Sequence, residues 1–107
     1  MDAKTLKEKL AGAELILQDE EAVEHFRFHA ADDGVGATLG MRDGPVCGPL
    51  LRYLVTGDAK VQISDHRSIL FTWEQVELSE GVVTARCGPR VKRFAFTPGK
   101  KRERYLP

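Results

Sequence analysis

The sequence has little of several features that usually indicate a function. Only two cysteines, Cys47 and Cys87, occur in 107 residues, so a framework of disulfide bonds is not what holds this fold. No apolar run approaches the roughly 20 residues that span a bilayer, and we expect no membrane span. Residues 1–10 alternate in charge where a secretory leader is apolar, so we expect the protein in the cytoplasm.

Motifs for catalysis and cofactor binding are also missing. Five glycines lie between residues 34 and 48, but no Gly-Lys-Ser/Thr follows them as in a phosphate-binding loop. No serine stands in a Gly-x-Ser-x-Gly motif, and no Cys–His pair is close enough in sequence to suggest a nucleophile. We predict that the protein is not an enzyme and has no cofactor.

Histidine and cysteine are common metal ligands, and two pairs of them are candidates for a metal site. His25 and His29 share one face of a predicted strand, but strand residues four apart are separated by roughly 13 Å, too far to share one zinc ion. Cys47 and Cys87 each precede a Gly-Pro pair, and the sequence leaves open whether the two meet in space. We therefore predict no metal site.

What the chain does contain is a succession of short β-rich segments separated by turns. The predicted turns are Asp32-Asp33-Gly34, Asp43-Gly44-Pro45, Gly57-Asp58, Ser64-Asp65, Glu80-Gly81 and Gly88-Pro89. Their spacing is typical of an antiparallel meander. Within the segments apolar residues alternate with polar ones, so Phe26 and Phe28 share one face, and Phe94 and Phe96 are predicted to point inward.

The longest predicted strand, residues 69–78, changes its inward parity. Ile69, Phe71 and Trp73 fall on one parity, whereas Val76 and Leu78 fall on the other. A β-bulge inserts one extra residue and so produces this switch. We predict a bulge near residues 74–75.

Together these segments predict a mainly β, single domain over residues 1–99. It is an antiparallel up-and-down meander of about eight strands, forming a closed or half-closed barrel, with one short N-terminal helix at residues 2–11. An open sheet covered on one face by the helix is the alternative, and its unpaired edge would favour a homodimer. Residues 100–107 form a basic C-terminal tail.

Charge is distributed unevenly along the chain although the formal net charge is zero. Residues 1–33 hold nine acidic and four basic residues, whereas residues 85–107 hold eight basic residues and one acidic residue. Opposite charges on the first and last strands would favour closure of a barrel through cross-strand pairs. Alternatively, basic residues would bind a nucleic acid or another polyanion; the candidates are Arg86, Arg90, Lys92, Arg93, Lys100, Lys101 and Arg102.

The chain resembles the small bacterial lipocalin-like domains. The resemblance is carried by Leu10-Ala11-Gly12 before the first strand, and by residues 26–34, an aromatic strand that enters an acidic-glycine hairpin. It implies a non-enzymatic domain that binds a small apolar molecule, or a barrel that its own side chains fill. For a ligand the candidate contacts are Trp73, Tyr53 and Phe28, with aromatic rings at the barrel mouth; a protein partner is the other possibility.

Overall fold

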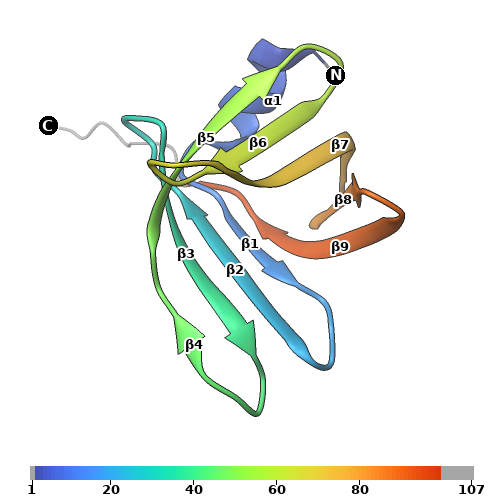
Figure 1. Ribbon diagram of the computed structural model, residues 1–107. Helices are drawn as coiled ribbons and strands as arrows, with labels where there is room; N and C mark the ends of the chain where they lie inside the picture. The colour runs from blue at the N-terminus through green and yellow to red at the C-terminus, as the bar shows by residue number, and fades with distance from the viewer. Residues whose placement is uncertain (1, 100–107) are drawn as a thin grey trace, which may run out of the picture.

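The computed structural model describes residues 2–99, which form one helix and nine strands (Figure 1). The elements are α1 (Ala3–Leu10), β1 (Glu14–Leu17), β2 (Ala22–Phe28), β3 (Gly34–Met41), β4 (Val46–Cys47), β5 (Leu50–Thr56), β6 (Lys60–Ser64), β7 (Ile69–Ser79), β8 (Val82–Cys87) and β9 (Arg90–Thr97). The predicted basic tail, with Lys100, Lys101 and Arg102, lies outside the described residues.

Eight of these strands close into an antiparallel barrel. Within the ring, each strand pairs with the next one along the chain, except that β3 pairs with β5 because β4 lies outside the ring. Pairing of β1 with β9 completes the ring. In that last pairing Leu15 lies opposite Phe96, and Leu17 lies opposite Phe94. The predicted mainly β meander is therefore confirmed as a closed barrel, and the alternative of an open sheet covered by a helix does not occur.

Alternation along the strands decides which side chains fill the barrel. Phe26, Phe28 and Phe94 are buried, as are the inward residues Val61 and Ile63 of β6, whereas the residues between them face outward. Phe96 is half-buried and packs against this core. Because every strand of a closed barrel has one inner face, the two-residue period of the sequence fixes these positions.

The predicted bulge in β7 is present, and a second irregularity precedes it. Pairing with β8 shifts between Glu74 and Glu77, and Gln75 has a φ of 51°, which returns Val76 to the core. Pairing with β6 shifts as well and sets Ile69 opposite Ser64, so Ile69 points outward and is 54% exposed. The prediction that Ile69 shares the inner face was wrong, because this shift reverses its parity.

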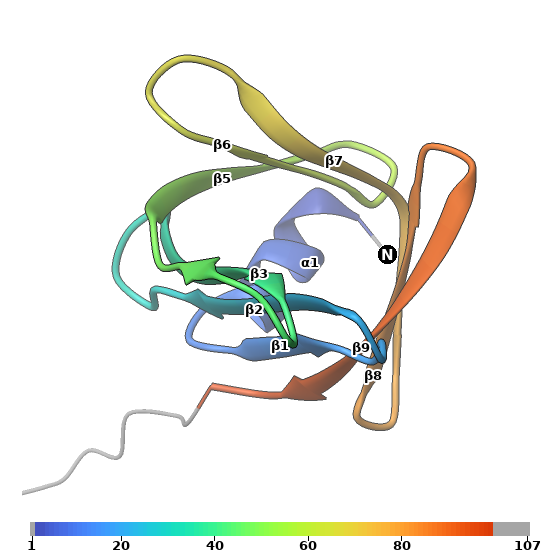
Figure 2. The ribbon, with the colours of Figure 1, turned by 60° about the horizontal axis from the view of Figure 1, so that its bottom comes forward.

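The helix closes one end of the barrel. Asp2 caps it, since its carboxylate accepts a hydrogen bond from the Thr5 backbone N–H at 2.8 Å, and Leu6 and Leu10 are fully buried. In Figure 2 the strands form a ring and α1 lies across its far end. Within residues 2–99, none of the helical structure has the length and hydrophobicity that crossing a membrane requires.

Aromatic side chains fill the middle of the barrel. Phe26 makes edge-to-face contacts with Phe71, Trp73 and Phe94, at centroid distances of 5.6, 5.2 and 6.1 Å. Trp73 is completely buried. Such contacts stabilise a core beyond the apolar area they bury, so the centre of this barrel is occupied by its own side chains.

One short strand, β4, lies outside the ring. It pairs only with β3, where Gly40 faces Val46 and Leu39 faces Cys47. Closure of the other strands removes the long unpaired edge on which the homodimer prediction depended, so β4 is the edge strand that the described part of the chain retains. The homodimer itself stays a prediction.

Candidate functional site at the open end of the barrel

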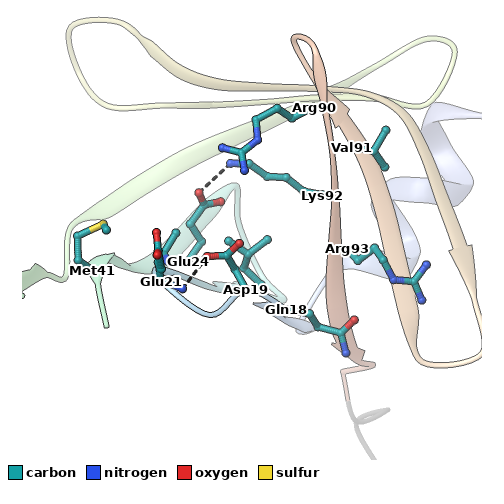
Figure 3. A pocket seen from close by; sticks show the side chains of 11 residues that line it. Gln18, Asp19, Glu21, Glu24, Met41, Arg90, Val91, Lys92 and Arg93 are labelled. Carbon is teal, nitrogen blue, oxygen red and sulfur yellow. Dashed lines mark hydrogen bonds and ion pairs between the residues drawn. The ribbon is translucent and has the colours of Figure 1, made fainter. Parts of the chain in front are cut away.

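The end of the barrel opposite α1 contains a hollow of about 400 Å³ (Figure 3). It lies between the β1–β2 hairpin and β9. Its lining comprises Leu17, Gln18, Asp19, Glu21, Ala22, Glu24, Met41, Arg90, Val91, Lys92 and Arg93. A volume of this size is at the lower end of the range of small-molecule sites.

Two oppositely charged side chains meet inside this hollow. Lys92 Nζ donates a hydrogen bond to Glu24 Oε2 at 2.7 Å, and the side chains are 19% and 13% exposed, respectively. The same ammonium group lies 5.5 Å from the centroid of the Phe71 ring. The ion pair joins the acidic N-terminal part of the chain to the basic C-terminal part. It does so between β2 and β9, which flank β1, and not through the predicted cross-strand pairs of the first and last strands.

Strand alternation places these two charges inside the barrel. Glu24 precedes the inward Phe26 by two residues on β2, and Lys92 precedes the inward Phe94 by two residues on β9. Each charged side chain therefore lies one layer closer to the open end than the aromatic core. The sequence-based prediction did not include Glu24 as a site residue. Because Glu24 lies two residues before Phe26, the strand alternation already indicated that its side chain points into the barrel.

One oxygen of this carboxylate has no partner. Glu24 Oε1 is shielded from solvent and has no hydrogen-bond partner among residues 2–99. The other buried polar atom of this kind is Trp73 Nε1, but Trp73 does not line the hollow. Glu24 Oε1 is therefore the unused acceptor that belongs to the open end.

The rim of the hollow is held by hydrogen bonds within the β1–β2 hairpin. Asp19 Oδ2 accepts hydrogen bonds from the backbone N–H groups of Ala22 and Glu21, at 2.6 and 2.8 Å, and these bonds lower the pKa of the Asp19 carboxyl. Arg42 donates to the carbonyl oxygens of Glu20 and Asp19 at 2.8 and 2.7 Å. The hairpin is thus tied to the end of β3.

Cys87 lies on the inner parity of β8 and packs against the core. Burial raises the pKa of its thiol, with opposing contributions from Lys92 and Glu24. The thiol rather than the thiolate is therefore the form at neutral pH. Cys47 is exposed on β4, which is not a neighbour of β8 in the sheet, and both cysteines are free.

The three aromatic residues predicted to contact a ligand lie elsewhere. Trp73, Tyr53 and Phe28 are all buried, at most 3% exposed, and none lines the hollow. The Tyr53 ring lies 5.3 Å from Lys7 Nζ of α1, which places it toward the closed end. The structure thus puts these rings in the packed core rather than at the barrel mouth, and their role in binding stays a prediction.

The basic residues of the polyanion alternative do not share one face. Arg86 and Arg93 lie on the outer parity of β8 and β9, whereas Arg90 and Lys92 lie on the inner parity. Lys92 is held by Glu24. No phenylalanine, tyrosine or tryptophan among residues 2–99 is exposed as a platform for base stacking. Binding of a polyanion stays a prediction without a shared surface in this part of the chain.

Two histidines contact carboxylates on the outside of the barrel. His25 Nε2 lies 3.2 Å from Glu14 Oε2, and His29 Nδ1 lies 2.9 Å from Asp32 Oδ1. His29 also borders a second, open hollow of about 710 Å³ between the β2–β3 and β6–β7 turns. In the described residues, no three His, Cys, Asp or Glu side chains gather as a metal ion would need.

The fold defines a small, closed, eight-stranded antiparallel barrel with a helix across one end, which is compatible with a lipocalin-like fold. Comparison with known proteins found no protein family, no curated protein and no solved structure that matches this chain. The site must therefore be interpreted from its own geometry.

Proposed function

We propose that this chain is a non-enzymatic, lipocalin-like binding domain that takes a small molecule at the open end of its barrel. The observation that carries the proposal is the hollow that contains the Glu24–Lys92 ion pair. Small-molecule sites are concave and fix their ligand through a few converging polar groups; in this hollow the polar groups outnumber the apolar ones.

Two features favour this end of the barrel over its interior. The interior is filled by aromatic rings in edge-to-face contact, which leaves a large apolar ligand no room beside them. The open end combines the apolar side chains of Leu17, Ala22 and Met41 with six charged residues, of which Glu24 and Lys92 are held inside the barrel. A small molecule with both polar and apolar parts suits this lining better than a fatty acid.

The proposal is tested by nuclear magnetic resonance with ¹⁵N-labelled protein and a panel of small polar and amphipathic molecules. We expect at least one compound to shift the backbone amide signals of residues 17–24, 41 and 90–93 in a saturable manner. Amides around the second hollow, at residues 29–34 and 64–66, serve as an internal control. Saturable shifts confined to the control residues, or none with any compound, would contradict the proposal.

A further inference from the structure

We infer that the ligand of the open end is a small, net-neutral molecule that carries a hydrogen-bond donor beside an acceptor, as amino-acid zwitterions and carboxamides do. This inference rests on the proposed function and names the chemistry that the hollow selects. Its basis is the incomplete use of the polar groups of Glu24 and Lys92.

Glu24 requires a donor. Its Oε2 atom accepts the hydrogen bond from Lys92, but its Oε1 atom is shielded from bulk water and has no partner among residues 2–99. A buried carboxylate oxygen without a donor is unfavourable, because it has lost its hydration and gained nothing. A ligand N–H group, charged or neutral, would supply the missing hydrogen bond.

Lys92 has donors that a ligand acceptor can use. An ammonium group has three donors, and the described contacts of Lys92 Nζ are one hydrogen bond to Glu24 and the face of the Phe71 ring. Arg90 also lines the hollow, where it is exposed to solvent and helps to lower the pKa of the Asp19 carboxyl. A ligand oxygen placed here would accept from either cation, next to the donor that Glu24 requires.

Charge balance selects a net-neutral ligand. The lining holds three acidic and three basic side chains, so its charges cancel, as do those of Glu24 and Lys92 inside the barrel. A ligand bearing only an ammonium or only a carboxylate would disturb this balance. An uncompensated charge in a partly buried site is costly. Because Glu24 Oε1 is shielded, the ligand reaches it when the flexible Lys92 side chain swings toward the ligand's acceptor.

Four molecules that share a 3-methylbutyl group and differ in their polar head test this selection: L-leucine, 4-methylpentanamide, 3-methylbutylamine and 4-methylpentanoate. We expect L-leucine or the amide to bind at least tenfold more tightly than the amine and the carboxylate, measured from the shifts of residues 17–24 and 90–93. The tighter of the first two shows whether the hollow prefers the zwitterion or the amide.

The variant Glu24→Gln tests the role of the carboxylate. It should weaken binding of L-leucine or of the amide, whichever binds the wild type more tightly, at least tenfold. Glu74→Gln should not change that binding, because Glu74 pairs with Lys60 at 3.7 Å in a half-exposed pair outside the hollow. The near-ultraviolet circular dichroism of the buried Trp73 reports whether each variant is folded. If Glu24→Gln is not, Lys92→Met must show the same loss.

Two results overturn the inference. Binding of the amine or the carboxylate as tightly as L-leucine and the amide would show that the hollow binds ligands but not by this chemistry, and the proposed function would stand. Absence of saturable shifts at the open end with these four probes and with the broader panel would overturn both.

Discussion

At the scale of single residues, the Glu24–Lys92 pair is the least conventional feature of the barrel interior, where it lies between the core and the open end. Removing one partner leaves the other charge inside the barrel, so Lys92→Met should lower the free energy of unfolding by about 1–3 kcal/mol. Replacing both residues by apolar ones, Glu24→Leu with Lys92→Met, should restore most of the loss, since a well-packed apolar pair often equals a buried ion pair. Urea unfolding of the wild type, Lys92→Met and the double variant measures these free energies.

The half-exposed outer pair, Lys60–Glu74, is the control for this comparison of single and double variants. The same replacements there should show a coupling of about 0.2–1 kcal/mol at most, as solvent-exposed pairs do. A double variant at Glu24 and Lys92 that is no more stable than Lys92→Met would contradict the interpretation, because it would mean that the lost stability came from packing rather than from an orphaned charge.

Aspartates that accept backbone hydrogen bonds make stability depend on pH. The pKa values of Asp2, Asp19, Asp32 and Asp65 are lowered below the usual 3.8, first of all by hydrogen bonds from backbone N–H groups. A carboxyl whose pKa is lower in the folded state stabilises the fold above its unfolded pKa, and this contribution disappears as the pH falls through the folded pKa.

We therefore expect the urea midpoint to be constant above about pH 5 and to fall progressively between about pH 4 and pH 2. The double variant Asp19→Asn, Asp65→Asn keeps an acceptor at each position but does not titrate there, so its midpoint should fall less steeply over the same range. A slope identical to that of the wild type would show that these two carboxyls are not responsible.

At the scale of elements, the turns decide where strands begin and end. Ser79 lies opposite Val82, so Glu80 and Gly81 form a two-residue turn, and both have positive φ, 22° and 78°. Two-residue hairpin turns with positive φ at both positions follow the right-handed twist of the strands. Glycine adopts this conformation without the steric penalty of a Cβ atom.

The variant Gly81→Ala should therefore lower the free energy of unfolding by about 1–2 kcal/mol. A Cβ at Gly81 would have no atom within 4 Å, so the cost comes from the backbone alone. Gly57→Ala is the matched control, because it is equally uncrowded and its φ is not positive; it should be neutral or slightly stabilising. Equal losses in both variants would contradict this explanation.

Much of each element was predictable from sequence, because alternation is a local property. The inward Phe26 and Phe28, and the bulge that returns Val76 to the core, follow from a period of two and its interruption. Ile69 was misplaced because its parity depends on the pairing shift against Ser64 of the neighbouring strand. No feature of residues 69–78 themselves records that shift.

At the scale of the whole molecule, closure depends on a pairing between residues about 80 positions apart along the chain, β1 with β9. Local patterns cannot reveal such a pairing, so the sequence left a closed barrel and an open sheet as alternatives. The candidate site has the same origin: Glu24 and Lys92 meet only because β2, β1 and β9 are neighbours. Prediction of ligand contacts from aromatic residues alone led to the packed core instead.

Hydrogen exchange tests closure. In a closed barrel the hydrogen-bonded amides between β1 and β9 should be protected about as strongly as those between β5 and β6, whereas those of β4, which pairs with β3 alone, should exchange faster. Rapid exchange of the amides shared by β1 and β9, with β5 and β6 still protected, would indicate an open sheet.

The most direct test of the account observes the Lys92 ammonium group itself, in a ¹H–¹⁵N spectrum of the lysine side chains recorded with and without L-leucine and 4-methylpentanamide. Lys92 Nζ is held inside the barrel by Glu24, so one ammonium signal should exchange slowly with water, vanish in Lys92→Met, and move when a ligand binds. A spectrum in which every lysine exchanges as a freely solvated group, and none responds to either compound, would contradict the account.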